Sequence, residues 1–133
     1  LRKSVSSNNI IFFDQVPSCQ IIELYKQVDI GIISLDVNHK THNIPGKLLT
    51  YVAAQLPVFA VVNPNNDLIS FIEKYKIGTV VQKHDILSMS NSLQQCISMI
   101  KMDKDIGERC KKMMVDNFTT EMIGKRLYDL FSR

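Results

Sequence analysis

The residues best suited to chemistry in this chain lie where a polar loop leads into a helix, at Pro45, Gly46 and Lys47. Proline is favoured in a first helical turn because its missing N–H would have no partner there. The free backbone N–H groups of a helix start attract anions, and phosphate groups are the usual occupants. An apolar strand is expected after this helix, from Pro57. The pattern predicts a phosphate site at residues 43–47.

Lys47 is the best single candidate for a ligand contact. A lysine in the first turn is electrostatically unfavourable, because a helix N-terminus already carries partial positive charge. A bound anion would remove that conflict, so we expect Lys47 to contact phosphate. The alternative is a lysine that is simply solvated.

Histidines in the preceding loop raise the question of a metal. His39 and His42 are close in sequence, but they have no neighbouring Cys or carboxylate cluster, so a solvated loop is the simpler interpretation. Asp36 is one carboxylate, too few for a metal site, and is expected to order its own loop. His42 is close enough to the anion site to serve there as a hydrogen-bond donor. We expect neither a metal nor a cofactor, and His84 is interpreted as a turn residue.

Size and composition indicate one ordinary globular domain over residues 1–133. The chain is 45% apolar and 22% charged, and its net charge of +3 is too small and scattered to favour nucleic acid. Its three cysteines fit no disulfide framework, which favours a reducing cytoplasm. No apolar run approaches the ~18 residues of a membrane span.

Hydrophobic patterning alternates between strands and helices. Strands are expected at 10–13, 29–35, 57–62 and 79–81, and helices from residue 18, at 45–54, at 67–76 and from 86 onward with breaks near 103 and 119–120. Apolar strands that alternate with helices predict an α/β fold, a Rossmann-like parallel sheet with helices on both faces and further C-terminal helices.

Right-handed crossovers would place every strand-to-helix loop on one edge of the sheet. Those loops are 14–17, 36–44, 63–66 and 82–85. Ligands of open α/β sheets bind along this edge. The helix start at 43–47 is therefore expected where this class of fold holds a ligand.

Four separated segments, in order, resemble a known family: 12–17, 24–29, 45–58 and 68–78. The third, which reads PGKLLTYVAAQLPV, is similar to a pattern of glycosyltransferases. The chain resembles the C-terminal, donor-binding domain of a GT-B glycosyltransferase of the retaining family 4, of the bacterial capsule and O-antigen type. The resemblance covers nearly the whole chain.

The resemblance implies a domain that binds a nucleotide-diphosphate sugar, UDP-sugars first, for transfer to a polysaccharide or lipid-linked acceptor. His42, Asn43, Ile44, Gly46 and Lys47 would line the diphosphate. Gln15, Val16 and Thr50 would lie near the base and ribose. The acceptor would bind an N-terminal domain that this chain lacks, without which no transfer is expected. The full enzyme would be cytoplasmic, associated peripherally with the inner face of the membrane.

The chain also departs from the family pattern. The paired glutamates of the family, eight residues apart, would fall at His42 and Thr50, and glycines are replaced by Asp14 and Gln55. These departures favour a second hypothesis, a non-catalytic Rossmann-like binding or assembly module. A phospho-receiver-like domain is a weaker third interpretation, because it needs clustered acids and only Asp36 is available.

Overall fold

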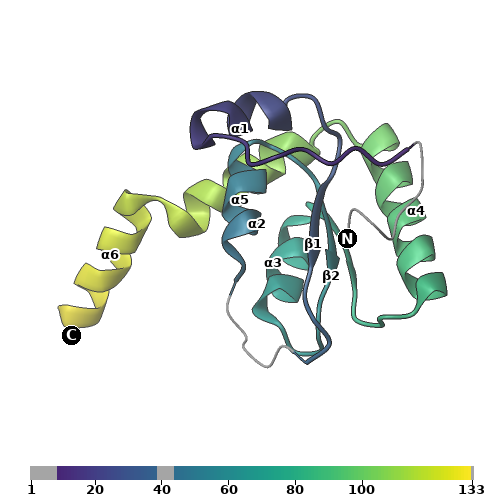
Figure 1. Ribbon diagram of the computed structural model, residues 1–133. Coiled ribbons are helices and arrows are strands. Elements are labelled where there is room, and N and C mark those ends of the chain that lie inside the picture. Colours follow the sequence, from purple (N-terminus) through teal and green to yellow (C-terminus); the bar gives the residue numbers. More distant parts are fainter. Residues whose placement is uncertain (1–8, 39–43, 133) are drawn as a thin grey trace.

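The chain forms three parallel strands and six helices within the residues that the computed structural model describes, 9–38 and 44–132 (Figure 1). Helices make up 56% of the structure. The elements, in chain order, are α1 (Ser18–Tyr25), β1 (Gly31–Ser34), α2 (Gly46–Ala53), β2 (Val58–Val61), α3 (Asp67–Tyr75), β3 (Gly78–Val81), α4 (Ile86–Met102), α5 (Ile106–Phe118) and α6 (Thr120–Phe131).

The sheet has the strand order β1-β2-β3, and both pairs are parallel. In the register, Val61 of β2 lies opposite Ser34 of β1 and Val81 of β3. Parallel neighbours need a crossover connection, and α2 and α3 supply the two crossovers. The predicted strands at 29–35, 57–62 and 79–81 are thereby confirmed.

Helices cover both faces of the sheet, as the apolar strands predicted. One core places β2 residues such as Val58 and Ala60 against α2, α3 and α5. A smaller core places the alternate residues Phe59 and Val61 against Cys96 of α4. Every residue of β2 is buried, which is the property of a central parallel strand. The α/β, Rossmann-like fold class is confirmed.

Helix boundaries follow local capping chemistry. Asn66 accepts a hydrogen bond from the Leu68 amide at the start of α3 (3.0 Å), and Thr119 accepts from the Met122 amide at the start of α6 (3.3 Å). Lys76, in the left-handed conformation at φ 52°, ends α3. The predicted C-terminal breaks near 103 and 119–120 are confirmed.

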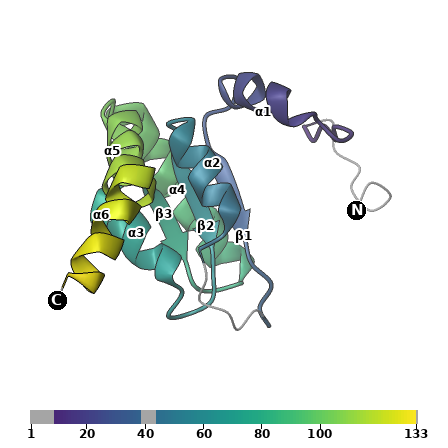
Figure 2. The same ribbon diagram turned by 90° about the vertical axis from the view of Figure 1, so that its left-hand side faces the viewer.

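The predicted strand at 10–13 is wrong. Residues 10–13 form no strand, and the side chains of Ile11 and Phe13 are 75% and 65% exposed. The segment leads to α1, which lies beyond the amino ends of the strands (Figures 1 and 2). A strand exists only when a neighbour supplies backbone partners, and this apolar run has none from the described part of the sheet. Residues 14–17 are consequently not a strand-to-helix loop.

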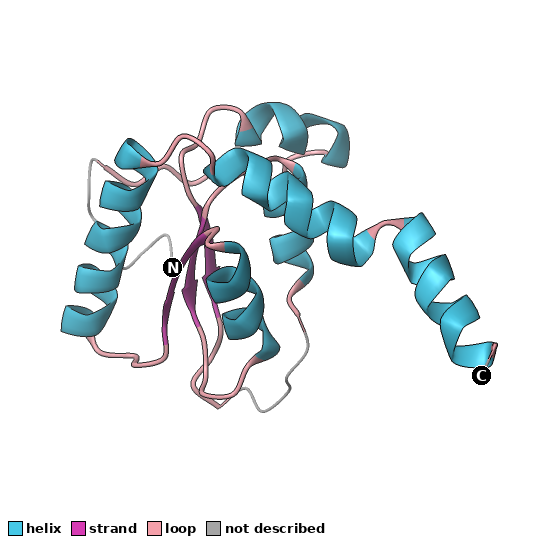
Figure 3. Cartoon of the chain, turned by 180° about the vertical axis from the view of Figure 1, so that it is seen from behind, coloured by secondary structure: helices cyan, strands magenta, loops and turns pink. Residues whose placement is uncertain are grey.

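The C-terminal helix α6 stands away from the sheet and contacts the rest of the molecule through α5 (Figure 3). Several of its apolar side chains are exposed, among them Leu127, Leu130 and Phe131. The molecule therefore has apolar surface at both ends of the described chain, at residues 10–13 and along α6.

Candidate functional site

The carboxyl edge of the sheet gathers the starts of three helices. The chain leaves β1, β2 and β3 at this edge and enters α2, α3 and α4 there, while α1 lies at the opposite end (Figures 1 and 2). This is the edge where open α/β sheets bind ligands. It is the natural place to look for a site.

The start of α2 has no side-chain cap within residues 9–38 and 44–132. Pro45 precedes the helix in an extended conformation (φ −61°, ψ 134°), and the first turn holds no acidic residue. A Cβ on Gly46 would meet no atom of the described residues within 4 Å. Unpartnered amides at a helix start are an anion-binding arrangement.

Two predicted residues flank this turn in different ways. The Lys47 side chain is exposed on the first turn of α2, where it adds positive charge beside the free amides. Ile44 is half-buried and packs against the main core. Ile44 thus anchors the approach to the helix, and Gly46 and Lys47 present the donors.

The two neighbouring helices that start at this edge, α3 and α4, each have a side-chain N-cap. Asn66 caps α3, and the Asp85 carboxylate accepts from the Ser88 amide at the start of α4 (2.8 Å). That amide hydrogen bond lowers the pKa of Asp85. At the start of α2 the Leu48 amide donates to the Pro45 carbonyl oxygen (2.9 Å), and within the described residues no side chain caps the amides of Gly46 and Lys47.

A bridge of side chains links the loops at the same edge. The Asn63 amide nitrogen donates to the Asp36 carbonyl oxygen (3.0 Å), and His84 Nε2 lies 3.1 Å from Asn63 Oδ1. The Asp36 carboxylate also accepts from the Asn38 amide (2.8 Å), as expected for an aspartate that orders its own loop. Asn63 and His84 were expected only as turn residues, and the sequence gives no sign that they meet.

The predicted base and ribose residues lie elsewhere. Val16 lines a hollow on α1 together with Gln20 and Leu24, and Gln15 is exposed nearby in sequence. Thr50 lines a different hollow, of ≈ 420 Å³, between α1 and α2. The Thr50 hydroxyl donates to the Lys47 carbonyl oxygen (2.9 Å) within its own helix. The structure therefore does not bring Gln15 and Val16 together with the start of α2.

Some of the predicted site falls outside the described residues. His42 and Asn43, together with His39, belong to the segment 39–43. Within 9–38 and 44–132, no group of three His, Cys, Asp or Glu side chains could hold a metal ion. Over the same residues, no helix combines the length and apolar character that a membrane crossing requires.

The contact between α1 and α2 rests on two tyrosines. The rings of Tyr25 and Tyr51 meet edge to face with centroids 5.3 Å apart. The Tyr51 hydroxyl donates to the Ile32 carbonyl oxygen of β1 (3.3 Å). Burial, followed by the neighbouring Tyr25, raises the pKa of Tyr51. Tyr51 thus links α2 to β1 through its hydroxyl and to α1 through its ring.

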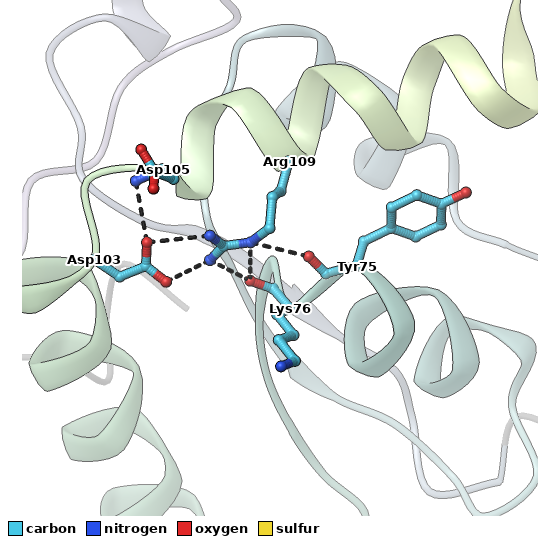
Figure 4. Close-up of polar contacts among 5 residues, drawn as sticks. All are labelled: Tyr75, Lys76, Asp103, Asp105 and Arg109. Carbon is cyan, nitrogen blue, oxygen red and sulfur yellow. Dashed lines mark hydrogen bonds and ion pairs between the residues drawn. The ribbon is translucent and has the colours of Figure 1, made fainter.

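Arg109 of α5 joins the end of α3 to the turn between α4 and α5 (Figure 4). Its Nε donates to the carbonyl oxygens of Tyr75 (3.1 Å) and Lys76 (3.2 Å), and its Nη1 donates to the Asp103 carboxylate (3.1 Å). These contacts supply donors to the carbonyl oxygens at the end of α3 and to the Asp103 carboxylate in the turn between α4 and α5. Their role is structural, since α3 ends at the opposite edge from the open helix start.

No family, curated protein or solved structure matches the chain. The assignment of a function therefore rests on the geometry of this edge and on the sequence resemblance described above.

Proposed function

We propose that this chain is the donor-binding, C-terminal domain of a GT-B glycosyltransferase and binds the diphosphate of a nucleotide sugar at the start of α2. The observation that carries the proposal is the helix start of Gly46 and Lys47 at the carboxyl edge of a parallel sheet, which no side chain of the described residues caps or covers. Free amides, a helix dipole and a lysine together suit a diphosphate better than any neutral ligand.

The proposed role in transfer is electrostatic. As the bond between sugar and diphosphate breaks, negative charge grows on the departing phosphate oxygens. Amide donors and Lys47 at the start of α2 would stabilise that charge without reorganisation. The acceptor would be held by a second, N-terminal domain, so the proposal assigns donor binding, and not complete transfer, to these residues. The donor we propose first is a UDP-sugar, and the place of action is the cytoplasm, at the inner face of the membrane.

A non-catalytic binding or assembly module is the second candidate. Thr50 stands where the family carries a glutamate for the ribose, and its short hydroxyl is already donated to the Lys47 carbonyl oxygen. The exposed apolar side chains at residues 10–13 and along α6 would offer such a module surfaces for association. Under this hypothesis the start of α2 would bind no nucleotide.

The test is a titration of the chain with UDP, GDP and ADP, followed by backbone amide shifts. We expect UDP to shift the amides of Gly46 and Lys47 first, with a Kd in the millimolar range or tighter. Lys47→Ala should weaken binding about tenfold, since one charge-assisted contact contributes about 1.4 kcal/mol or more.

The matched control is Lys111→Ala, which removes the same charge from an exposed position on α5. It should leave nucleotide affinity unchanged. If no nucleotide shifts Gly46 or Lys47 at millimolar concentration, donor binding at this helix start is refuted. Thr50→Glu, which restores the acid of the family pattern, should strengthen UDP binding, and an unchanged affinity would favour the second candidate.

A further inference from the structure

Helix α6 presents a row of apolar side chains that the described part of the chain leaves uncovered. Ile123, Leu127, Leu130 and Phe131 follow one another at intervals of four, three and one residues, which places them on one side of the helix, and Tyr128 flanks them. These five residues, which we call the α6 stripe, are between 45% and 87% exposed. Within the described residues, no side chain of α6 is buried.

The charged residues of α6 lie away from the stripe. Glu121, Lys125 and Asp129 follow one another at intervals of four residues, which places them on the opposite side of the helix. This distribution is that of an amphipathic helix whose apolar side packs against a partner. A helix of 12 residues is marginally stable in water, and in a protein its stability comes mainly from such packing. We therefore expect a surface that covers the stripe.

The direction of α6 is set where it leaves α5. Thr119, in an extended conformation (φ −76°, ψ 152°), interrupts the helical backbone and accepts a hydrogen bond from the Met122 amide. Further along, Arg126 Nη2 donates to the Asp116 carbonyl oxygen (3.2 Å) and to Asn117 Oδ1 (3.3 Å) of α5. Helix α6 thus leaves α5 in a defined direction and extends away from the sheet (Figure 3). These contacts present the stripe to the outside of the molecule.

We propose that the α6 stripe is a dimer interface, in which α6 packs antiparallel against α6 of a second copy of this chain. The stripe offers about 500 Å² of exposed apolar surface in each copy. A two-fold pair would bury about 1,000 Å², which reaches the size that a specific interface needs. Dimers with two-fold symmetry are also the commonest soluble oligomers. This inference does not depend on the proposed function.

The shape of α6 favours a second copy as the partner. Gly124 borders Leu127 and Tyr128 on the helix surface, and a Cβ on it would meet no atom of the described residues within 4 Å. It therefore leaves a depression at the flank of the stripe. In an antiparallel pair centred between Leu127 and Tyr128, Phe131 of the second copy lies level with Gly124, on the same flank, because both residues are equally far from the centre. The most exposed side chain of the stripe then covers the depression, once from each copy.

Substitutions in the stripe separate association from folding, because none of its side chains is buried in the described chain. Leu127→Glu places a charge at the centre of the pair. The matched control is Leu87→Glu, which makes the same change at an exposed position on α4. Gly124→Leu fills the depression. The added leucine would increase nonspecific apolar association, but in the proposed pair it obstructs Phe131 of the second copy.

The experiment is sedimentation equilibrium of the full chain, together with backbone amide shifts on dilution. The chain of 15.2 kDa should approach twice its mass with a Kd of about 100 µM or tighter, and the amides that shift on dilution should be those of α6. Leu127→Glu and Gly124→Leu should each weaken association about tenfold or more. Leu87→Glu should associate within about twofold of the wild type.

Each of four results would overturn the inference. A chain that stays monomeric at millimolar concentration refutes the pair and leaves the stripe to a different protein. A monomer whose α6 amides shift on addition of phosphatidylcholine vesicles would show that the stripe meets a membrane instead. Unchanged association of Leu127→Glu would place the interface elsewhere on the chain. Stronger association of Gly124→Leu would mark nonspecific apolar contact and not a fitted pair.

Discussion

The guanidinium of Arg109 is hydrogen-bonded to the carbonyl oxygen of Lys76, which lies 3.0 Å from its Nη2 and 3.2 Å from its Nε. Lys76 is the left-handed residue that ends α3, so an arginine on α5 satisfies a carbonyl that the helix itself leaves open. The same guanidinium binds Asp103 before α5 begins. The Arg109 side chain therefore connects three parts of the fold: the end of α3, the turn that follows α4, and α5 itself.

Removing this guanidinium should destabilise the fold without affecting ligands. We expect Arg109→Met to lower the free energy of unfolding by about 1–2 kcal/mol, because the carbonyls of Tyr75 and Lys76 lose their donor. Arg109→Lys should not rescue it, since an ammonium cannot replace the planar set of donors. Urea denaturation measures the change. If Arg109→Met lowered the free energy of unfolding no more than the control Lys111→Ala does, the structural role of Arg109 would be contradicted.

The ion pair between Asp103 and Arg109 should make the free energy of unfolding depend on pH in the acidic range. The hydrogen bond from Arg109 lowers the pKa of Asp103 in the folded chain. Such a group stabilises the fold above its unfolded pKa of about 3.9, and the contribution is lost as the pH falls through the lower, folded value. We expect Asp103→Asn to be less stable than the wild type at neutral pH. The difference should shrink below about pH 4, as urea melts across pH would measure. A difference that stays constant with pH would refute this.

Gln55 occupies a backbone conformation that suits glycine. Its φ of 59° lies in the left-handed region, immediately after the C-cap of α2. Glycine adopts this conformation without steric cost, so Gln55→Gly should raise the free energy of unfolding by about 0.5–1 kcal/mol. Gln55→Ala keeps the Cβ and should bring no gain. Thermal melts of the two variants would make the comparison, and equal melting temperatures would contradict the expectation.

Two glycines should respond in opposite ways to alanine. A Cβ on Gly78 would overlap the backbone carbonyl of Val58, whereas one on Gly46 would meet no atom of the described residues within 4 Å. We expect Gly78→Ala to cost about 3 kcal/mol or more, because neither paired strand can give way. Gly46→Ala should keep its stability and weaken UDP binding, because the added methyl would stand where the diphosphate approaches. Circular dichroism melts and the nucleotide titration would test both parts.

The three thiols should differ sharply in reactivity. Cys19 is exposed, whereas Cys96 and Cys110 are buried. Burial raises the pKa of Cys96, and it raises that of Cys110 to about 12. Only thiolates react readily, so we expect a thiol reagent at neutral pH to modify Cys19 alone in the folded chain. All three should react in denaturant, and rapid modification of three thiols under native conditions would count against this burial.

Sequence patterning predicts the sheet well where burial is continuous. The apolar run that becomes β2 is bounded by Pro57 and Asn63, and its burial on both faces agrees with its composition. The run at 10–13 has the same local character but lies exposed. The two differ only in the presence of neighbouring strands, which is a property of the whole fold and not of four residues.

The candidate site could be predicted from the sequence only in the parts that depend on local signals. Pro45 and Gly46 mark a helix start locally, and the order of elements places it at the carboxyl edge. The contact between Asn63 and His84 joins residues 21 positions apart and depends on the register of β2 with β3. The one sequence signal for this contact is that Asn63 and His84 each follow a predicted strand by a few residues. Nothing in the sequence alone fixes the pairing level of those strands.

The apolar surface at both ends of the described chain has a calorimetric consequence. Ile11, Phe13 and Phe131 keep 75%, 65% and 87% of their surface exposed in the folded chain. Side chains that are already hydrated when the chain is folded add nothing to the heat capacity of unfolding. The curve of stability against temperature should therefore be flatter than the length of the chain would suggest.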